Sequence, residues 1–358
     1  MENDSPQTSI PTPAGTVPTL QTQPPQQHHS VKLYILLGLA FIILVALATV
    51  YRHRNTAITS QDTAQSTEAL EPVFYETSDV AELMQVINDA STIQQLQDSL
   101  NVKLESIAQE RTKSLPDTRP RPPKLLLIED SLIAQGLTYS DVNFLTNQDM
   151  EDVKRFSRIF VQEYYKYPVQ WANFKRPGLI ILTGAEELSD QYQDDSVAVA
   201  QAGLLHALFN IGELTAYEDD YIARAIHHEF MHSFDTDSYV VASFDDKELT
   251  RAKYHSRWAE LNQDGNNSYL GFDANIDPSY SQVHPETGFI TGYAMTDPAE
   301  DRAEVMAFIM TNDYGQKLTT LMKEDKILAD KVDMLINDIS ESLKSKVSLD
   351  TYFSEFSR

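Results

Sequence analysis

The residues best suited to chemistry lie close together in the stretch 227–232, which has the sequence His-His-Glu-Phe-Met-His. Within it, His228, Glu229 and His232 form the motif H-E-x-x-H. Side chains four residues apart share one face of a helix, so both imidazoles of the motif could bind the same zinc ion. Glu229 would lie beside the metal and could activate a water molecule as a general base. His227 points about 100° away around such a helix and is left out of the site.

A zinc ion held by two histidines needs a third protein ligand and an open position for water. Asp235 lies seven residues after His228 on the same helical face. It is one candidate for the third ligand, although it could instead support the ligands through hydrogen bonds or be a polar residue near the helix end. Farther along, Asp297 followed by Pro298 predicts the start of another helix. Glu300 falls in its first turn, where it could bind the metal or complete a capping box with Asp297.

The chain resembles gluzincin zinc metallopeptidases, specifically the anthrax lethal factor-like group and its related bacterial zinc-binding metallopeptidases. In that group, H-E-x-x-H is followed by a segment Y-x-x-T-N-x-x-E-x-x-A-E. The chain has Asp297 in place of the Asn of this segment. It matches the segment, in register, at Tyr293, Thr296, Glu300, Ala303 and Glu304. A stretch between the motifs is also similar, at Trp258, Leu261, Asn262, Gly265 and Tyr269.

The resemblance implies a role for each matching residue. Three of them would be zinc ligands: His228, His232 and Glu300. Glu229 would be the general base. Tyr293 would face the zinc from the opposite side and donate a hydrogen bond to the oxyanion of the reaction. Glu304 would not bind the zinc itself but would support its ligands.

The resemblance also implies the α+β fold of a zincin-like metallopeptidase domain. Such a domain has a small mixed sheet with an edge strand, an active-site helix and a mainly helical C-terminal part. The apolar run 204–211, bounded by Gly203 and Gly212, predicts a strand. It could be the edge strand, to which an extended peptide would add by backbone pairing, or an ordinary core strand. Shorter apolar runs predict further strands at 124–128 and 179–183.

One segment before the catalytic region has the composition of a membrane span. Residues 33–51 carry no charge and no proline, which predicts one transmembrane helix over 32–51. A cleaved signal peptide is the alternative, because Ala46-Leu47-Ala48 fits a cleavage site. Basic residues flank both ends of the span, so they decide little about its orientation. We expect a single-pass protein of the cell membrane, in contact with the lipid bilayer, with its catalytic domain outside the cytoplasm.

Composition divides the rest of the chain. Residues 1–31 are rich in Pro, Gln, Thr and Ser and predict a disordered tail, and 52–72 predict a linker. Apolar residues recur every three or four positions over 73–115, which indicates a helical stalk or accessory segment. Several prolines follow, and the expected zincin-like domain covers 116–358.

The overall composition limits the possible functions. The chain has no cysteine, which excludes disulfides, thiolate zinc sites and cysteine nucleophiles. Its net charge of −25 argues against nucleic acid as a partner. We therefore expect a membrane-anchored, zinc-dependent peptidase that acts on a peptide or protein substrate. The alternative is a catalytically inactive, zincin-like surface or peptide-binding module.

Overall fold

A computed structural model describes these parts of the chain: 71–113, 115, 124–127, 141–142, 145–174, 178–184, 186–187, 200–202, 206–246, 248–262, 269–271, 283–343, 349 and 352–356. They belong to one unit, Thr67–Arg358. The expected tail 1–31 and nearly all of the expected linker 52–72 lie outside the described residues.

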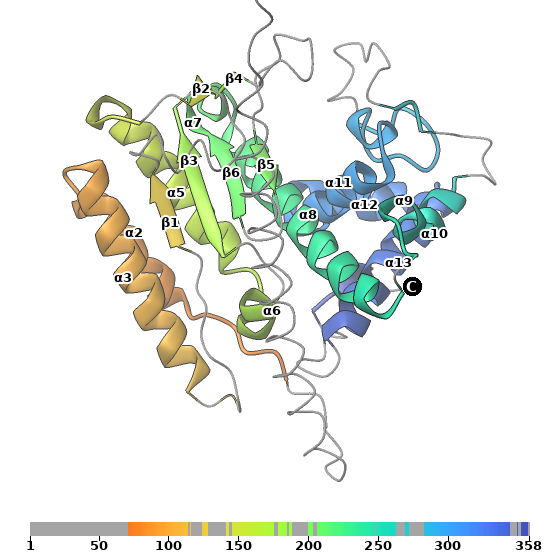
Figure 1. Ribbon diagram of the computed structural model, residues 1–358, viewed down its shortest axis with the longest axis horizontal. Helices are drawn as coiled ribbons and strands as arrows, with labels where there is room; N and C mark the ends of the chain where they lie inside the picture. Colours follow the sequence, from red (N-terminus) through yellow and green to blue (C-terminus); the bar gives the residue numbers. More distant parts are fainter. Residues whose placement is uncertain are drawn as a thin grey trace, which may run out of the picture. The chain divides into compact units, whose positions relative to one another are not determined.

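A small sheet of four strands has the order β1-β3-β6-β5 (Figure 1). The strands are β1 (Lys124–Leu127), β3 (Leu179–Thr183), β5 (Ala200–Ala202) and β6 (His206–Asn210). Strands β1, β3 and β6 run parallel to one another, and β5 runs antiparallel to β6. A separate pair is formed by β2 (Asp141–Val142) and β4 (Glu186–Glu187). Consecutive residues of β3 and β6 are buried, as expected for strands covered on both faces.

Two helices cover the β1 side of the sheet. They are α2 (Thr77–Asp89) and α3 (Ile93–Thr112), and both lie in the segment 73–115. Their buried leucines follow the predicted spacing, and α3 packs on β1 while α2 packs on α5 (Met150–Tyr164). The side chain of Asn101 in α3 exchanges two hydrogen bonds with the backbone of Leu125, at 2.7 and 2.8 Å. These bonds satisfy backbone groups of β1, which lies at one edge of the described sheet.

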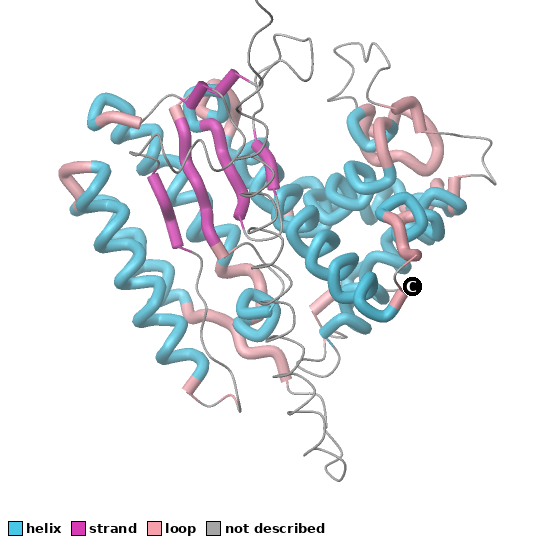
Figure 2. Tube along the Cα trace, in the orientation of Figure 1, coloured by secondary structure: helices cyan, strands magenta, loops and turns pink. Residues whose placement is uncertain are grey.

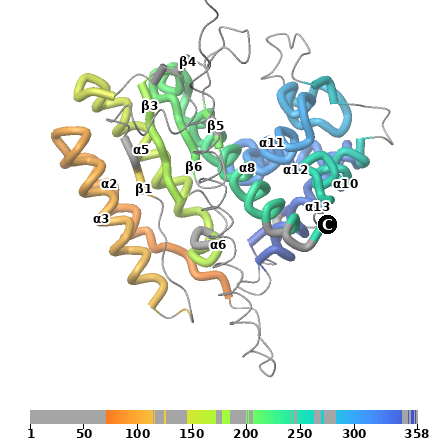
Figure 3. The backbone as a smooth tube through the Cα atoms, viewed as in Figure 1, coloured from red at the N-terminus to blue at the C-terminus, as the bar shows by residue number. Residues whose placement is uncertain are grey.

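The chain then continues through mainly helical structure to its C-terminal part (Figure 3). Among the described helices, the longest is α8 (Asp219–Asp245), which packs on α11 (Pro298–Met310). The remaining elements are η1 (Asn147–Asp149), α6 (Val169–Phe174), α7 (Ile211–Leu214), α9 (Arg251–Tyr254), α10 (Ser256–Glu260), η5 (Tyr293–Met295), α12 (Asn312–Leu321), α13 (Lys326–Leu343) and η6 (Ser354–Phe356).

The expected α+β class, with a transmembrane helix before the zincin-like domain, is wrong. The described part is mostly helical, and its sheet is small (Figure 2). The sheet strands have only three to five residues, whereas α8 alone has 27. Much of the core is formed by helix packing on helix, as between α8 and α11, so fewer apolar residues belong to strands.

The structure decides between the two alternatives for the run 204–211, an edge strand or a core strand. The run 204–211 contains β6, which pairs with β3 on one side and β5 on the other. The strand is therefore internal, and β5 lies at that edge of the sheet. The strand ends at Asn210, and α7 begins directly after it. The Asn210 side chain caps α7 by accepting a hydrogen bond from the Glu213 N–H at 3.4 Å.

The expectation of a single-pass membrane protein with an extracytoplasmic catalytic domain is corrected as well. In the described residues, no helix is both long enough and apolar enough to cross a bilayer. A span needs about 20 mainly apolar residues, and long helices such as α8 carry several charged side chains. The segment 32–51, from which the membrane contact was inferred, lies outside the described residues.

Candidate metal centre

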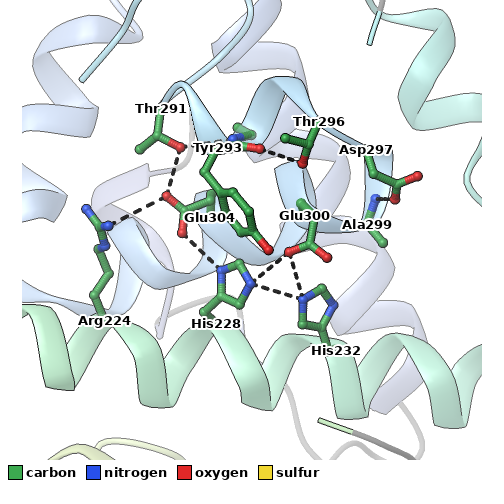
Figure 4. A network of polar contacts seen from close by, with 11 residues as sticks. Arg224, His228, His232, Thr291, Tyr293, Thr296, Asp297, Ala299, Glu300 and Glu304 are labelled. Carbon is green, nitrogen blue, oxygen red and sulfur yellow. Dashed lines mark hydrogen bonds and ion pairs between the residues drawn. The ribbon is translucent and has the colours of Figure 1, made fainter. Parts of the chain in front are cut away.

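Helix α8 carries the two histidines of the H-E-x-x-H motif. Its core face buries Ile222, Ile226 and Phe230, which holds the opposite side of the helix at a fixed orientation toward α11. His228 and His232 lie one turn apart on that side (Figure 4). Their Nε2 atoms are 3.0 Å apart, so the two rings face the same point.

Helix α11 brings Glu300 to this point. Asp297 caps the helix by accepting a hydrogen bond from the Ala299 N–H at 2.7 Å, and Pro298 occupies the first turn. Glu300 therefore projects from the first turn of α11 toward α8 (Figure 4). Its Oε2 atom lies 3.0 Å from Nε2 of His228 and 3.1 Å from Nε2 of His232.

These three side chains fit a zinc ion. One ligand atom from each of His228, His232 and Glu300 lies within 4.8 Å of the others. Tetrahedral ligands about 2.0–2.1 Å from a zinc ion are about 3.3 Å from one another, close to the separations found here. Two imidazoles and a carboxylate also form one of the ligand sets of catalytic zinc sites.

The electrostatics of the cluster favour a cation. Burial alone would lower the pKa of His228, but the carboxylates of Glu300 and Glu304 outweigh it and raise the pKa to about 10. The pKa of His232 is also raised, because Glu300 outweighs the effect of burial. Burial opposes ionisation of Glu300, yet the two histidines hold its pKa well below the ordinary value. Without a metal, the positive charge beside these carboxylates comes from the protonated histidines. A divalent cation bound between the groups would supply positive charge in their place.

Glu229 follows His228 in the sequence, and its side chain is buried on α8. Its Oε2 atom has no hydrogen-bond partner in the described part of the chain. Burial raises the pKa of Glu229, and the nearby histidines only partly oppose this. A carboxylate with a raised pKa can take up and release a proton near neutral pH, which suits a general base.

Tyr293 lies in η5, directly before α11, and its ring centre is 5.7 Å from that of His228. Its side chain extends toward the space near Glu300 (Figure 4). Burial, followed by the charges of Glu300 and Glu229, raises the pKa of Tyr293 well above its ordinary value. The hydroxyl therefore keeps its proton and can donate a hydrogen bond.

Glu304 lies one turn beyond Glu300 on α11. It contacts His228 on the Nδ1 side of the ring, whereas Nε2 faces Glu300. Its Oε1 atom is 3.0 Å from Nδ1 of His228. Its Oε2 atom accepts a hydrogen bond from the Thr291 hydroxyl at 2.8 Å and lies 4.0 Å from Nη2 of Arg224. Burial alone would raise the pKa of Glu304, but His228 and Arg224 outweigh it and lower the pKa.

Asp235 pairs with an arginine of α11. Its two oxygens accept hydrogen bonds from Nε and Nη2 of Arg302 at 2.9 and 3.1 Å, and both side chains are buried. Arg302 also donates to Asp338 of α13 at 3.0 Å. Asp235 thus ties the ligand helix α8 to α11 and α13 through a two-pronged ion pair.

Two buried clusters were not found from the sequence. In the first, Asp301 Oδ2 accepts hydrogen bonds from Trp258 Nε1 at 2.8 Å, the Tyr269 hydroxyl at 2.7 Å and the Lys331 ammonium at 2.5 Å. Trp258 and Tyr269 belong to the stretch that resembles the segment between the motifs. That similarity was the available signal for this cluster, whereas nothing in the sequence marked Lys331 as their neighbour.

The second cluster surrounds His227, the histidine left out of the predicted site. The Tyr167 hydroxyl lies 2.7 Å from Nδ1, and Glu163 Oε2 lies 2.7 Å from Nε2. Burial is the largest influence on His227 and lowers its pKa. A neutral ring that accepts from Tyr167 and donates to Glu163 satisfies both contacts. The cluster joins α5 to α8 on a side away from the ligands.

Comparisons with known proteins place the chain in a family. One solved structure, described as a "putative zinc-binding metallo-peptidase" from Bacteroides caccae, is 16% identical and has a TM-score of 0.33. The alignment covers 61% of this chain and 80% of the other. No protein with curated annotation matches the chain. A family model described as "Putative zinc-binding metallo-peptidase" matches residues 150–348, which include the histidines of α8 and Glu300 of α11. The chain is therefore a member of this zinc-binding metallopeptidase family.

Proposed function

We propose that the chain is a peptidase of the gluzincin type, which hydrolyses peptide bonds with zinc held by His228, His232 and Glu300. The main support is the convergence of these three side chains within 4.8 Å, next to the buried Glu229. The third ligand would come from a second helix, α11, as in the gluzincin pattern that the sequence resembles. The position of Tyr293 near His228 and of Glu304 behind it supports the lethal factor-like subgroup.

Each side chain has a specific task in this proposal. Zinc, when bound, supplies Lewis-acid chemistry toward water and the scissile carbonyl. Glu229 accepts a proton from the attacking water and returns it to the leaving amine. Tyr293 donates a hydrogen bond to the oxyanion, a contribution of about 3 kcal/mol for comparable donors. Glu304 holds the ring of His228 in place.

The substrate would be a peptide or protein in an extended conformation. Strand β5 lies at the edge of the sheet and packs near α8. The other edge, β1, is partly paired by the side chain of Asn101. Backbone pairing with β5 would place an extended peptide beside the ligand helix, which is a common mode of peptide recognition.

The proposed function is tested by measuring zinc content and hydrolysis on the same protein. We expect purified full-length chain to bind about one zinc ion and to cleave members of an unbiased peptide library. Glu229→Gln should keep the zinc and lose hydrolysis, because the amide cannot accept the proton. Glu218→Gln, at the exposed start of the same helix, is the matched control and should retain both. Hydrolysis that survives Glu229→Gln would refute the mechanism, and a zinc-bound but inert wild type would favour a peptide-binding module.

A further inference from the structure

Arg224 forms an ion pair with the buried carboxylate of Glu304. It lies on α8, four residues before His228, so the two side chains share one face of the helix. Both reach the same carboxylate (Figure 4): Nδ1 of His228 lies 3.0 Å from Oε1, and Nη2 of Arg224 lies 4.0 Å from Oε2. Glu304 is therefore held between the histidine and the arginine.

Aromatic rings from three helices hold the guanidinium of Arg224. Its Cζ atom lies 5.3 to 5.5 Å from the ring centres of Tyr221 on α8, Phe308 on α11 and Tyr314 on α12. Each of these distances falls within the range of cation–π attraction. The side chain is only 12% exposed. The charge of Arg224 is therefore fixed in position beside Glu304.

Thr291 fixes the orientation of the same carboxylate oxygen. Its hydroxyl accepts a hydrogen bond from the Ala294 N–H at 3.1 Å and donates to Glu304 Oε2 at 2.8 Å. Thr291 and Arg224 thus both act on Oε2, which leaves Oε1 directed at His228. An Nδ1–H bonded to Oε1 leaves the lone pair of Nε2 pointing toward His232 and Glu300.

We propose that Arg224 is a positioning residue of the metal centre, which acts on zinc binding through Glu304 and His228. It balances the charge of the buried carboxylate and helps to keep Oε1 against Nδ1, so that the ring presents Nε2 to the metal. At 4.0 Å the contact is an ion pair and not a hydrogen bond, so the effect is electrostatic. This inference depends on the zinc site of the proposed function.

The test is the dissociation constant of Zn²⁺, measured by competition with a chromophoric chelator on the full chain. Residues that orient a metal ligand directly change metal affinity by about 10- to 100-fold when removed. We expect Glu304→Gln to fall in this range. Arg224→Gln should weaken zinc binding by about 10-fold, at the lower end, because it acts through Glu304.

A double-mutant cycle separates a role through Glu304 from general damage to the fold. In the presence of Glu304→Gln, Arg224→Gln should cause little further loss of affinity. If the two losses multiply, Arg224 does not act through Glu304 and the inference is wrong. Should Arg224→Gln fail to fold, Arg224→Lys is measured in the same cycle, and its smaller loss should likewise depend on Glu304.

Lys317 offers a matched control on the same aromatic ring. Its ammonium lies 4.6 Å from the ring centre of Tyr314, but it pairs with none of the site carboxylates among the contacts described. Lys317→Gln should leave the zinc affinity unchanged, and an equal loss in this variant would overturn the inference. A wild type that binds no zinc would refute the proposed function itself. A wild type that binds zinc, with Arg224→Gln equal to it, would refute only the role of Arg224.

Discussion

The ammonium group of Lys331 lies 2.5 Å from Oδ2 of Asp301, and both side chains are completely buried. Asp301 follows Glu300 in α11, so this ion pair anchors the helix turn that carries the proposed third ligand. Trp258 and Tyr269 donate to the same oxygen. The segment between the two motifs therefore has a structural role: its aromatic residues hydrogen-bond to α11 through Asp301.

Removal of one partner of this ion pair should strongly destabilise the protein. Lys331→Met leaves the charge of Asp301 buried and uncompensated, which costs about 3–5 kcal/mol in comparable cases. Asp301→Asn combined with Lys331→Met should cost less, because the amide oxygen can still accept from Trp258 while no lone charge remains. The free energy of unfolding in urea, measured on metal-free protein, checks both expectations.

Lys326 lies on the same helix as Lys331, α13, and provides the control for this prediction. It pairs with Asp330 at the surface, and its side chain is 82% exposed. Exposed ion pairs contribute about 0–1 kcal/mol, so Lys326→Met should change the stability little. If Lys331→Met and Lys326→Met were equally mild, the buried pair would not anchor α11 as described.

Substitutions in the first turn of α11 distinguish a ligand from a helix cap. Glu300 Oε2 lies near both imidazoles, whereas Asp297 accepts from the Ala299 N–H. We expect Glu300→Ala to weaken zinc binding by more than about 100-fold, beyond the effect of a residue that only orients a ligand. Asp297→Ala should cost about 1 kcal/mol of stability and leave zinc affinity nearly intact. A Glu300→Ala variant that binds zinc normally but melts earlier would identify Glu300 as a capping residue.

The buried Glu163 should make the stability depend on pH in the acid range. Burial opposes its ionisation, but His227 and Lys166 outweigh burial and lower its pKa below the ordinary 4.5. A carboxyl whose pKa is lower in the folded state stabilises the fold above the unfolded pKa. That stability is lost as the pH falls through the folded pKa. Between about pH 5 and pH 3, metal-free wild type should therefore lose stability more steeply than Glu163→Gln.

Glu151→Gln is the control for this pH dependence, since Glu151 lies on the same helix with its side chain 82% exposed. Its acid unfolding curve should match that of the wild type. The measurement is the free energy of unfolding at a series of pH values, by denaturant titration followed by circular dichroism. Parallel curves for the wild type and Glu163→Gln would show that the Glu163 cluster does not contribute to acid sensitivity.

Much of the local structure could be predicted from the sequence, because local features depend on residues close together along the chain. Asp297 and Pro298 predicted the start of α11, and the structure has its cap and first turn there. The apolar spacing over 73–115 predicted helices, and α2 and α3 lie in that segment. The four-residue spacing of His228 and His232 placed both on one face of a helix, as observed in α8.

The sequence could not decide features that depend on pairing between distant segments. The run 204–211 contains a strand, but its internal place results from pairing with both β3 and β5. The expected proportion of helix and strand was wrong. The described part is mostly helical, and much of its core forms by helix packing, as between α8 and α11. Periodicity shows which face of an element is apolar, and it does not show what that face will contact.

The sequence alone determined which groups could perform the chemistry, because motif spacing and helix geometry act over a few residues. The tertiary structure decided how those groups are held. Glu304 reaches His228 across 76 positions of the chain, and Lys331 reaches Asp301 across 30. Such contacts form only when helices pack, since burial brings charges together and makes each one depend on its partner.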